Sequence, residues 1–187
     1  MIGFALCGSF CTVRHALIQL EQLSSSYEIQ GIVSEAVYQT DTRFAPAADV
    51  LREIRRITKK EHIIHTIVEA EPLGPRTPLD ALIICPCTGN TLAKMANGIT
   101  DSAVTMAAKA HLRSNRPLVI ALASNDALSA NLKNIGEMLT RKHVYFVPMK
   151  QDDPEGKPHS LVADFTLLPQ TLQAALGGKQ YQKLFWV

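Results

Sequence analysis

The sequence predicts an α/β protein built on a doubly wound, mostly parallel sheet with helices on both faces. Short apolar runs alternate along the chain with segments whose apolar residues recur at helical spacing. This alternation is typical of parallel strands joined by crossover helices. Polar turns at Ser9, Ser34, Thr88 and Ser124 each follow a predicted strand. In such sheets ligands bind beyond the carboxyl ends of the strands, so these turns indicate a site.

Length and composition limit the class of protein. The chain has 187 residues, 47% of them hydrophobic and 19% charged, so we expect a single folded domain over residues 1–187. A net charge of +2 argues against nucleic acid as a partner. No apolar run is long enough to span a membrane, and no charged region precedes the apolar start, so we expect a cytoplasmic protein.

The first half predicts a strand over residues 2–7, a helix from Val13 to Leu23 and a second strand within residues 28–37. A helix over residues 47–57 has a basic face, which we interpret as solvated surface. Residues 62–68 are rich in β-formers, and residues 69–78, with three prolines, predict an ordered loop.

The central stretch, residues 80–101, begins with an apolar strand over Ala81–Cys85. Pro86 is expected to end that strand because proline has no N–H for the ladder. A helix should then begin near Thr88, and Asp101 is expected to cap the next helix.

The remaining chain predicts a strand over residues 117–123, a helix over residues 132–139 and a last strand over residues 143–147. A terminal helix is expected over residues 161–176, with Pro169 at the first turn of its second half. The tail, residues 177–187, is either loosely ordered or docks on another subunit through Tyr181, Phe185 and Trp186.

Two of the polar turns open helices and suit an anion. The loops Gly8–Thr12 and Thr88–Thr91 supply hydroxyls beside the free N–H groups of a helix start. The alternative is that these hydroxyls only cap their own helices. No G-x-G-x-x-G motif is present, which argues against NAD bound in the usual way. A phosphorylated, partly apolar ligand such as flavin mononucleotide (FMN) fits the pattern.

Four cysteines fall at the ends of two predicted strands: Cys7, Cys11, Cys85 and Cys87. Their spacings only loosely resemble those of structural zinc sites, so no metal is predicted. Buried small side chains are the simpler interpretation. A row of four thiols along one edge of the sheet is the alternative, and whether they do chemistry stays open.

Residues 86–101 resemble the Pro-Ala-Ser-Ala-Asn-Thr motif and its extension in the homo-oligomeric flavin-containing cysteine decarboxylase family. The resemblance runs nearly end to end, through residues 8–12, 41–44, 70–75, 124–128 and 145–148. It implies a Rossmann-like, flavodoxin-like three-layer α/β/α fold. It also implies FMN bound at subunit interfaces of a trimer or an assembly of trimers.

The resemblance implies a set of residues around the FMN phosphate, ribityl chain and ring. The predicted cofactor-binding residues are Gly8, Ser9, Cys11, Thr12, Ser34, Pro86, Cys87, Thr88, Gly89, Asn90, Thr91, Ser124 and Asn125.

Within that family, the sequence most resembles a branch in which the chain is one subunit of a two-subunit oxidoreductase. This implies a small dicarboxylate substrate and a partner subunit that carries NAD(P). A dianion favours guanidinium donors, and Arg43 and Arg76 are the candidates, with Asn90 and Asn125 as orienting groups. The alternative for both arginines is a surface ion pair. No residue is marked as a general base, so the catalytic residues are unknown.

Departures from the family pattern leave other functions open. Residues 69–73 contain no histidine where the peptidyl-cysteine decarboxylases carry a catalytic one, so that reaction is not expected. One alternative is a non-catalytic flavin-fold scaffold that stabilises its partner subunit. Another is an active flavin-dependent decarboxylase or a prenyl-flavin transferase.

Overall fold

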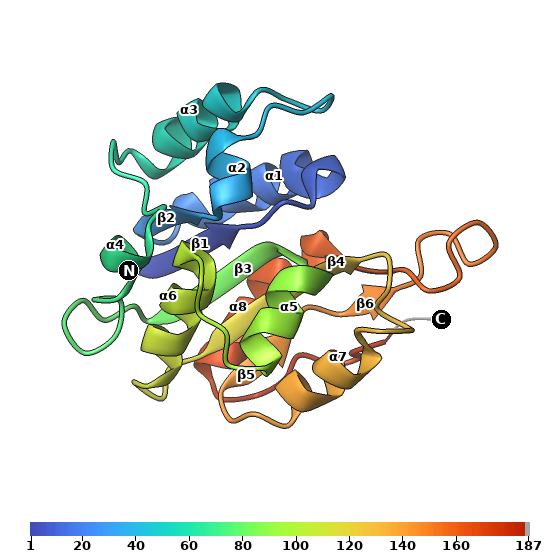
Figure 1. Cartoon of the computed structure of the whole chain (residues 1–187). Helices are drawn as coiled ribbons and strands as arrows, with labels where there is room; N and C mark the ends of the chain where they lie inside the picture. The colour runs from blue at the N-terminus through green and yellow to red at the C-terminus, as the bar shows by residue number, and fades with distance from the viewer. Residues whose placement is uncertain (186–187) are drawn as a thin grey trace.

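Seven strands form one sheet in the computed structural model, which describes residues 1–185 (Figure 1). Five parallel strands lie in the flavodoxin-like order β2-β1-β3-β4-β5. Two short antiparallel strands, β6 and β7, extend the sheet beside the carboxyl end of β4. The bounds are β1 Ile2–Leu6, β2 Ile29–Val33, β3 Ala81–Thr88, β4 Leu118–Ser124, β5 Val144–Phe146, β6 Met149–Lys150 and β7 Leu161–Ala163.

Helices cover both faces of the sheet, which confirms the doubly wound fold. Helices α5, α6 and α7 pack together on one face, and α1 and α8 lie on the other with α3 beside α1 (Figure 1). Because both faces are covered, β1 and β4 are buried at every position. The helix bounds are η1 Phe10–Thr12, α1 Val13–Ser24, α2 Glu35–Gln39, α3 Ala47–Thr58, α4 Ile67–Ala70, α5 Gly89–Ala96, α6 Ala103–Leu112, α7 Leu132–Leu139, η2 Phe165–Leu167 and α8 Leu168–Leu176.

The expectation that Pro86 ends the central strand is wrong. Strand β3 continues to Thr88, and its pairing with β4 shifts register between Ile84 and Cys87. The shift lets the ladder pass a residue without an N–H, while the Pro86 carbonyl still accepts a hydrogen bond from the Cys7 N–H at 3.2 Å. The strand therefore ends at Thr88, three residues later than expected, and leads directly into α5.

Two further expectations are corrected by local chemistry. Residues 62–68 form a single parallel bridge, Ile32 to Ile64, and then enter α4, whose start is fixed by a capping box between Thr66 and Glu69. Helix α6 is capped by Ser102 rather than Asp101. Instead, Asp101 forms an ion pair with Lys94 at 2.8 Å.

The largest correction concerns residues 149–163. Strand β5 is not the last, because β6 and β7 pair antiparallel after it and residues 161–163 are strand rather than helix. Pro169 lies in the first turn of α8, as predicted. The β6–β7 pairing folds residues 151–160 back as a protruding loop toward the carboxyl edge of the sheet (Figure 1).

The described part of the tail, residues 177–185, contacts the domain. The Gln180 amide accepts from the Phe146 N–H at 2.9 Å and donates to the Phe146 carbonyl at 2.7 Å. Phe185 bridges Met149 in parallel and is half exposed. Trp186, the other predicted docking residue, lies outside the described residues. Docking of the tail on another subunit stays a prediction.

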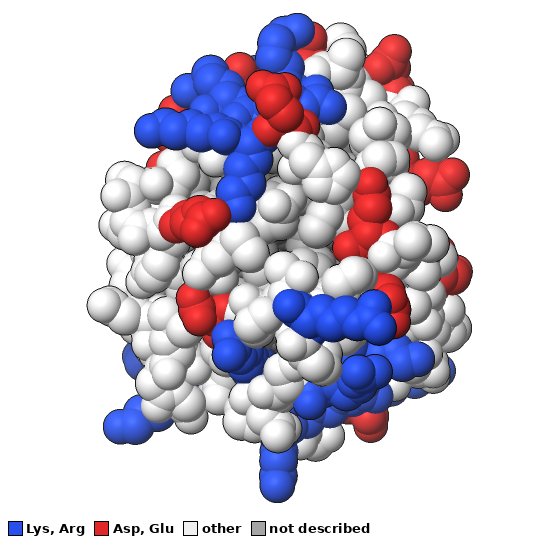
Figure 2. Space-filling model, turned by 90° about the vertical axis from the view of Figure 1, so that its left-hand side faces the viewer, with Lys and Arg blue, Asp and Glu red and all other residues white. Residues whose placement is uncertain are grey.

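Basic side chains gather over α3 at the top of Figure 2. Arg52 pairs with Asp49, and Arg56 pairs with both Glu53 and Glu21. This face is therefore a solvated, charge-paired surface, as the sequence predicted. Among the described residues, no helix is long and apolar enough to cross a membrane.

Candidate functional site

A pocket of about 550 Å³ opens at the carboxyl edge of the sheet, where β1, β3 and β4 end. Two loops form its mouth, residues 41–46 on one side and residues 151–160 on the other. Its lining comprises Gly8, Ser9, Phe10, Cys11, Thr12, Arg43, Phe44, Thr88, Gly89, Asn90, Ala123, Ser124, Asn125, Asp126, Asp152, Lys157, Ser160 and Val162.

The first wall is the turn after β1. It enters η1, and the N–H groups of Phe10 and Cys11 stand at the start of that helix, where no helical acceptor precedes them. The Thr12 hydroxyl donates to the Ser9 carbonyl at 2.9 Å and to the Ser9 hydroxyl at 3.1 Å. Neither Ser9 nor Thr12 caps its helix through its side chain, so the simple capping alternative is wrong for both.

The second wall is the start of α5. The Thr88 hydroxyl accepts from the Thr91 N–H at 3.1 Å, so here the capping interpretation is confirmed. Gly89 and Asn90 occupy the first two helical positions, whose N–H groups have no intrahelical acceptor. Asn90 is exposed in the pocket, whereas Gly89 is buried against the end of β4.

The third wall is the end of β4. Ser124 is buried, Asn125 is exposed, and Asp126 turns its carboxylate to the Ser124 hydroxyl and the Asn131 amide. Those hydrogen bonds lower the pKa of Asp126, so the carboxylate is ionised at neutral pH. The sequence alone assigns no role to Asp126.

Aromatic and cationic side chains stand at the mouth. The Arg43 guanidinium carbon lies 4.9 Å from the centre of the Phe44 ring, a cation–π arrangement. On the opposite loop the Lys157 ammonium pairs with Asp152 at 3.1 Å. Of these four, only Arg43 is predicted from the sequence. The loop with Lys157 is missed because the β6–β7 pairing that brings it to the pocket has no signal in the sequence.

Four predicted cofactor residues do not line this pocket. Ser34 accepts from the Val37 N–H at 3.4 Å and caps α2. Pro86 and Cys87 are buried within β3, and Thr91 is buried beneath Thr88, whose hydroxyl donates to it at 3.0 Å. Pro86, Cys87 and Thr91 therefore support the wall from behind.

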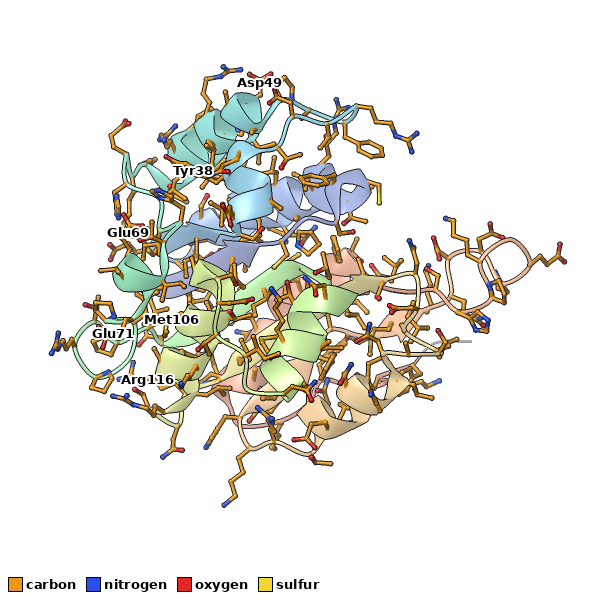
Figure 3. All side chains as sticks on the ribbon, viewed as in Figure 1. Tyr38, Asp49, Glu69, Glu71, Met106 and Arg116 are labelled. Carbon is orange, nitrogen blue, oxygen red and sulfur yellow. The ribbon has the colours of Figure 1, made fainter. Side chains whose placement is uncertain are left out.

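Arg76 is separated from Arg43. It lies in the turns that lead into β3, at the amino edge of the sheet, where Figure 3 labels Glu71 and Arg116. The Arg116 guanidinium donates to the Leu79 carbonyl at 2.8 Å and holds this segment in place. Arg43 lines the carboxyl-edge pocket and Arg76 does not, so within one chain the two predicted guanidinium donors do not meet at one site.

Three of the four cysteines are buried free thiols, whereas Cys11 is exposed at the pocket, so the interpretation as a buried side chain is wrong for Cys11. Burial raises the pKa of Cys7 to about 11, although hydrogen bonds with the Thr91 side chain and the Thr88 backbone lower it in part. Burial also raises the pKa values of Cys85 and Cys87. These three thiols are protonated at neutral pH and pack as small apolar side chains, as predicted.

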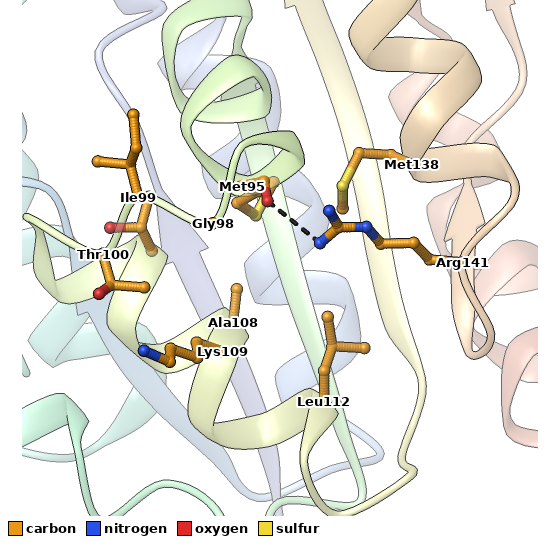
Figure 4. Close-up of a pocket in the computed structure, with 10 residues that line it drawn as sticks. Met95, Gly98, Ile99, Thr100, Ala108, Lys109, Leu112, Met138 and Arg141 are labelled. Atoms are coloured by element: carbon orange, nitrogen blue, oxygen red, sulfur yellow. Dashed lines mark hydrogen bonds between the residues drawn. The ribbon is translucent and has the colours of Figure 1, made fainter.

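A second hollow of about 200 Å³ lies between α5, α6 and α7 (Figure 4). Met95, Ile99, Leu112 and Met138 contribute its apolar lining. The Arg141 guanidinium spans it to the end of α5, donating to the carbonyls of Met95 at 3.2 Å and Ala96 at 2.7 Å. This arrangement ties α7 to α5 and satisfies carbonyls at a helix end.

Comparison with known proteins agrees with the fold. The dipicolinate synthase B subunit of Bacillus subtilis (strain 168) is 45% identical over 184 residues, which covers 98% of this chain and 92% of that protein. The crystal structure of the dipicolinate synthase B subunit from Bacillus halodurans C is 44% identical, with a TM-score of 0.91 over 100% of this chain and 95% of that one.

More distant structures share the architecture. The FMN-dependent cysteine decarboxylase SpaF is 22% identical, with a TM-score of 0.67 over 93% of this chain and 95% of that one, a likeness that shows the fold alone. The family model described as flavoprotein matches residues 1–163, a span that contains every residue lining the carboxyl-edge pocket. The chain belongs to the flavoprotein family.

Proposed function

We propose that this chain is an FMN-binding subunit of dipicolinate synthase. It would contribute, during sporulation, to the oxidation of dihydrodipicolinate to pyridine-2,6-dicarboxylate. The relative at 45% identity supports the assignment of the enzyme. The observation that supports FMN binding is the carboxyl-edge pocket itself, in which two helix starts and two phenylalanines converge.

The residues of the pocket fit the chemistry of FMN. Its volume of about 550 Å³ lies within the usual range of small-molecule sites. The N–H groups at the start of η1, with the hydroxyls of Ser9 and Thr12, are suited to a phosphate. Phe10 and Phe44 offer apolar surface to a ring system.

In this proposal the chain binds FMN and orients the substrate beside it. Bound FMN would supply reversible two-electron redox chemistry. Arg43 and Lys157, on the two loops at the mouth, would attract the carboxylates of a pyridine dicarboxylate. The three protonated thiols take no part as nucleophiles.

The partner would be the A subunit of dipicolinate synthase, which would carry NAD(P). In this chain the turn after β1 runs Gly8-Ser9-Phe10-Cys11-Thr12 and lacks the second glycine of a dinucleotide fingerprint. Assembly of the chain into trimers or multiples of trimers belongs to the same proposal. These assignments rest on the resemblance to the relatives named above.

The test is a titration of the purified chain with FMN, alone and with the partner subunit, followed by flavin fluorescence. Ser9→Asp puts a carboxylate beside the proposed phosphate site, and Ser9→Asn is the neutral variant of matched size. We expect micromolar binding by the wild type, binding within about tenfold of that by Ser9→Asn, and none by Ser9→Asp, because like charges repel. No binding by the wild type in either form would refute the cofactor and favour a non-catalytic scaffold.

A further inference from the structure

Asp126 lines the carboxyl-edge pocket and is hydrogen-bonded into its wall, whereas Asp152 pairs with Lys157 at the mouth. Asp126 Oδ1 accepts from the Ser124 hydroxyl at 2.5 Å and from the Asn131 amide at 2.9 Å, and its Oδ2 accepts from the same amide at 2.8 Å. A carboxylate offers about four acceptor sites, and the Ser124 and Asn131 side chains do not fill them, so Asp126, which lines the pocket, keeps acceptor capacity.

The carboxylate is held by a chain of buried side chains. The Asn131 carbonyl accepts from the Asn134 amide at 2.8 Å, and both asparagines are less than 8% exposed. The backbone adds two bonds, because the N–H groups of Ser129 and Asn131 both donate to the Asp126 carbonyl, at 3.1 and 3.0 Å. Asp126 therefore presents a fixed negative charge, which cannot turn away when a ligand enters.

This charge stands next to the start of α5. A Cβ atom built on Gly89 would lie 2.8 Å from Asp126 Oδ1. The positive end of the α5 dipole therefore already faces a carboxylate of the protein itself. A phosphate placed there would be repelled by that carboxylate, whereas the start of η1 offers N–H groups and two hydroxyls.

We propose that Asp126 accepts a hydrogen bond from an N–H or O–H group of the bound ligand and thereby fixes its direction in the pocket. If the ligand is FMN, as proposed above, the phosphate lies at the start of η1. The ribityl hydroxyls or the ring N–H then face the end of β4. In this arrangement the wall after β4 binds a hydrogen-bond donor of the ligand, and the wall after β1 binds its anionic group.

The test uses two ligands, FMN and riboflavin, which differ only in the phosphate. Both are titrated against the wild type, Asp126→Asn and Ser9→Asp. Asp126→Asn should lower the affinity for both ligands by the same factor, about tenfold to a hundredfold. The reason is that FMN and riboflavin share the group that donates to Asp126, and this hydrogen bond loses its charged acceptor. Ser9→Asp should abolish FMN binding and leave riboflavin binding unchanged.

Asp49→Asn is the matched control, since it removes one negative charge on α3, far from the pocket (Figure 3). It should leave both affinities unchanged. Urea unfolding of each variant confirms that it is folded, and Asp126→Ser replaces Asp126→Asn if the latter unfolds; its short hydroxyl should give the same equal loss.

Each remaining outcome overturns the inference. Equal affinities in Asp126→Asn and the wild type would make Asp126 a purely structural residue. Tighter FMN binding by Asp126→Asn, with riboflavin unchanged, would place the phosphate beside Asp126. Failure of the wild type to bind either flavin would refute the proposed function, and this inference with it.

Discussion

Gly89 shows how closely α5 approaches the end of β4. A side chain at this position would meet the Ser124 hydroxyl, the Asn131 amide at 2.7 Å and the Asp126 carboxylate at 2.8 Å. Such separations are shorter than a carbon atom tolerates, and these neighbours are held by hydrogen bonds to one another. Glycine is therefore required for contact between two walls of the carboxyl-edge pocket.

We expect Gly89→Ala to destabilise the protein by about 1–3 kcal/mol, because the added methyl overpacks a buried, bonded network. Gly136→Ala is the matched control: it lies inside α7, where an added Cβ meets nothing within 4 Å. That change should stabilise by about 0.5–1 kcal/mol through helix propensity. Urea unfolding measures both. Equal effects of the two changes would show that the α5–β4 approach is looser than described.

Some residues of the site can be identified from the local sequence pattern, and others cannot. Ser9, Thr12 and Thr88 lie where a strand passes into a helix, so the order of elements alone brings them to one edge. Asp126 looks like an ordinary turn residue in the sequence, and its role depends on Asn131, five residues away on the far side of a turn. A contact of that kind has no local signal.

At the scale of elements, the start of α6 shows which of two neighbouring residues, Asp101 or Ser102, caps the helix. The Ser102 hydroxyl accepts from the Thr105 N–H at 3.2 Å, and the Thr105 hydroxyl accepts from the Ser102 N–H at 3.1 Å. Ser102→Ala should therefore lower the free energy of unfolding by about 1 kcal/mol.

Asp101→Ala should change the stability little, because it removes only an exposed pair with Lys94. Thermal or urea unfolding of the two variants decides between the neighbours. A larger loss from Asp101→Ala would restore the cap that the sequence alone favoured.

Strands and helices up to residue 147 could be predicted largely from periodicity, because parallel strands buried on both faces are continuous apolar runs. The exceptions have physical reasons. Pro86 breaks the expected ladder only if the register is fixed, and here the register shifts. Residues 149–150 and 161–163 are too short to show alternation, and they become strands only by pairing with β4 and each other.

At the scale of the whole molecule, the buried histidine of α6 gives stability a dependence on pH. His111 is fully buried; one ring nitrogen contacts the Pro117 carbonyl at 2.9 Å, and among the described residues Nδ1 has no hydrogen-bond partner. Burial lowers the pKa of His111 below 6.5, with Arg116 adding to the effect and the Pro117 carbonyl opposing it. The folded state therefore keeps this histidine neutral.

Between the pKa of His111 in the folded state and 6.5, the unfolded chain binds more protons than the folded chain. The contribution of neutral His111 to the free energy of unfolding is therefore complete above pH 6.5 and is lost as the pH falls. We expect the free energy of unfolding to decline from pH 7 to pH 5, and to decline less in His111→Gln, which keeps a donor for the Pro117 carbonyl. Urea unfolding at each pH gives both curves. Parallel curves would mean that His111 does not contribute.

The walls of the carboxyl-edge pocket come from opposite ends of the chain, residues 8–12 and residues 152–162. During synthesis, the first wall leaves the ribosome long before the last, and β7 must pair with β4 before the loop with Lys157 can stand opposite Arg43. A ligand that arrived earlier would meet only part of its site. Ligand loading is thus confined to nearly complete chains, and a nascent chain stalled before residue 149 would have no closed pocket to fill.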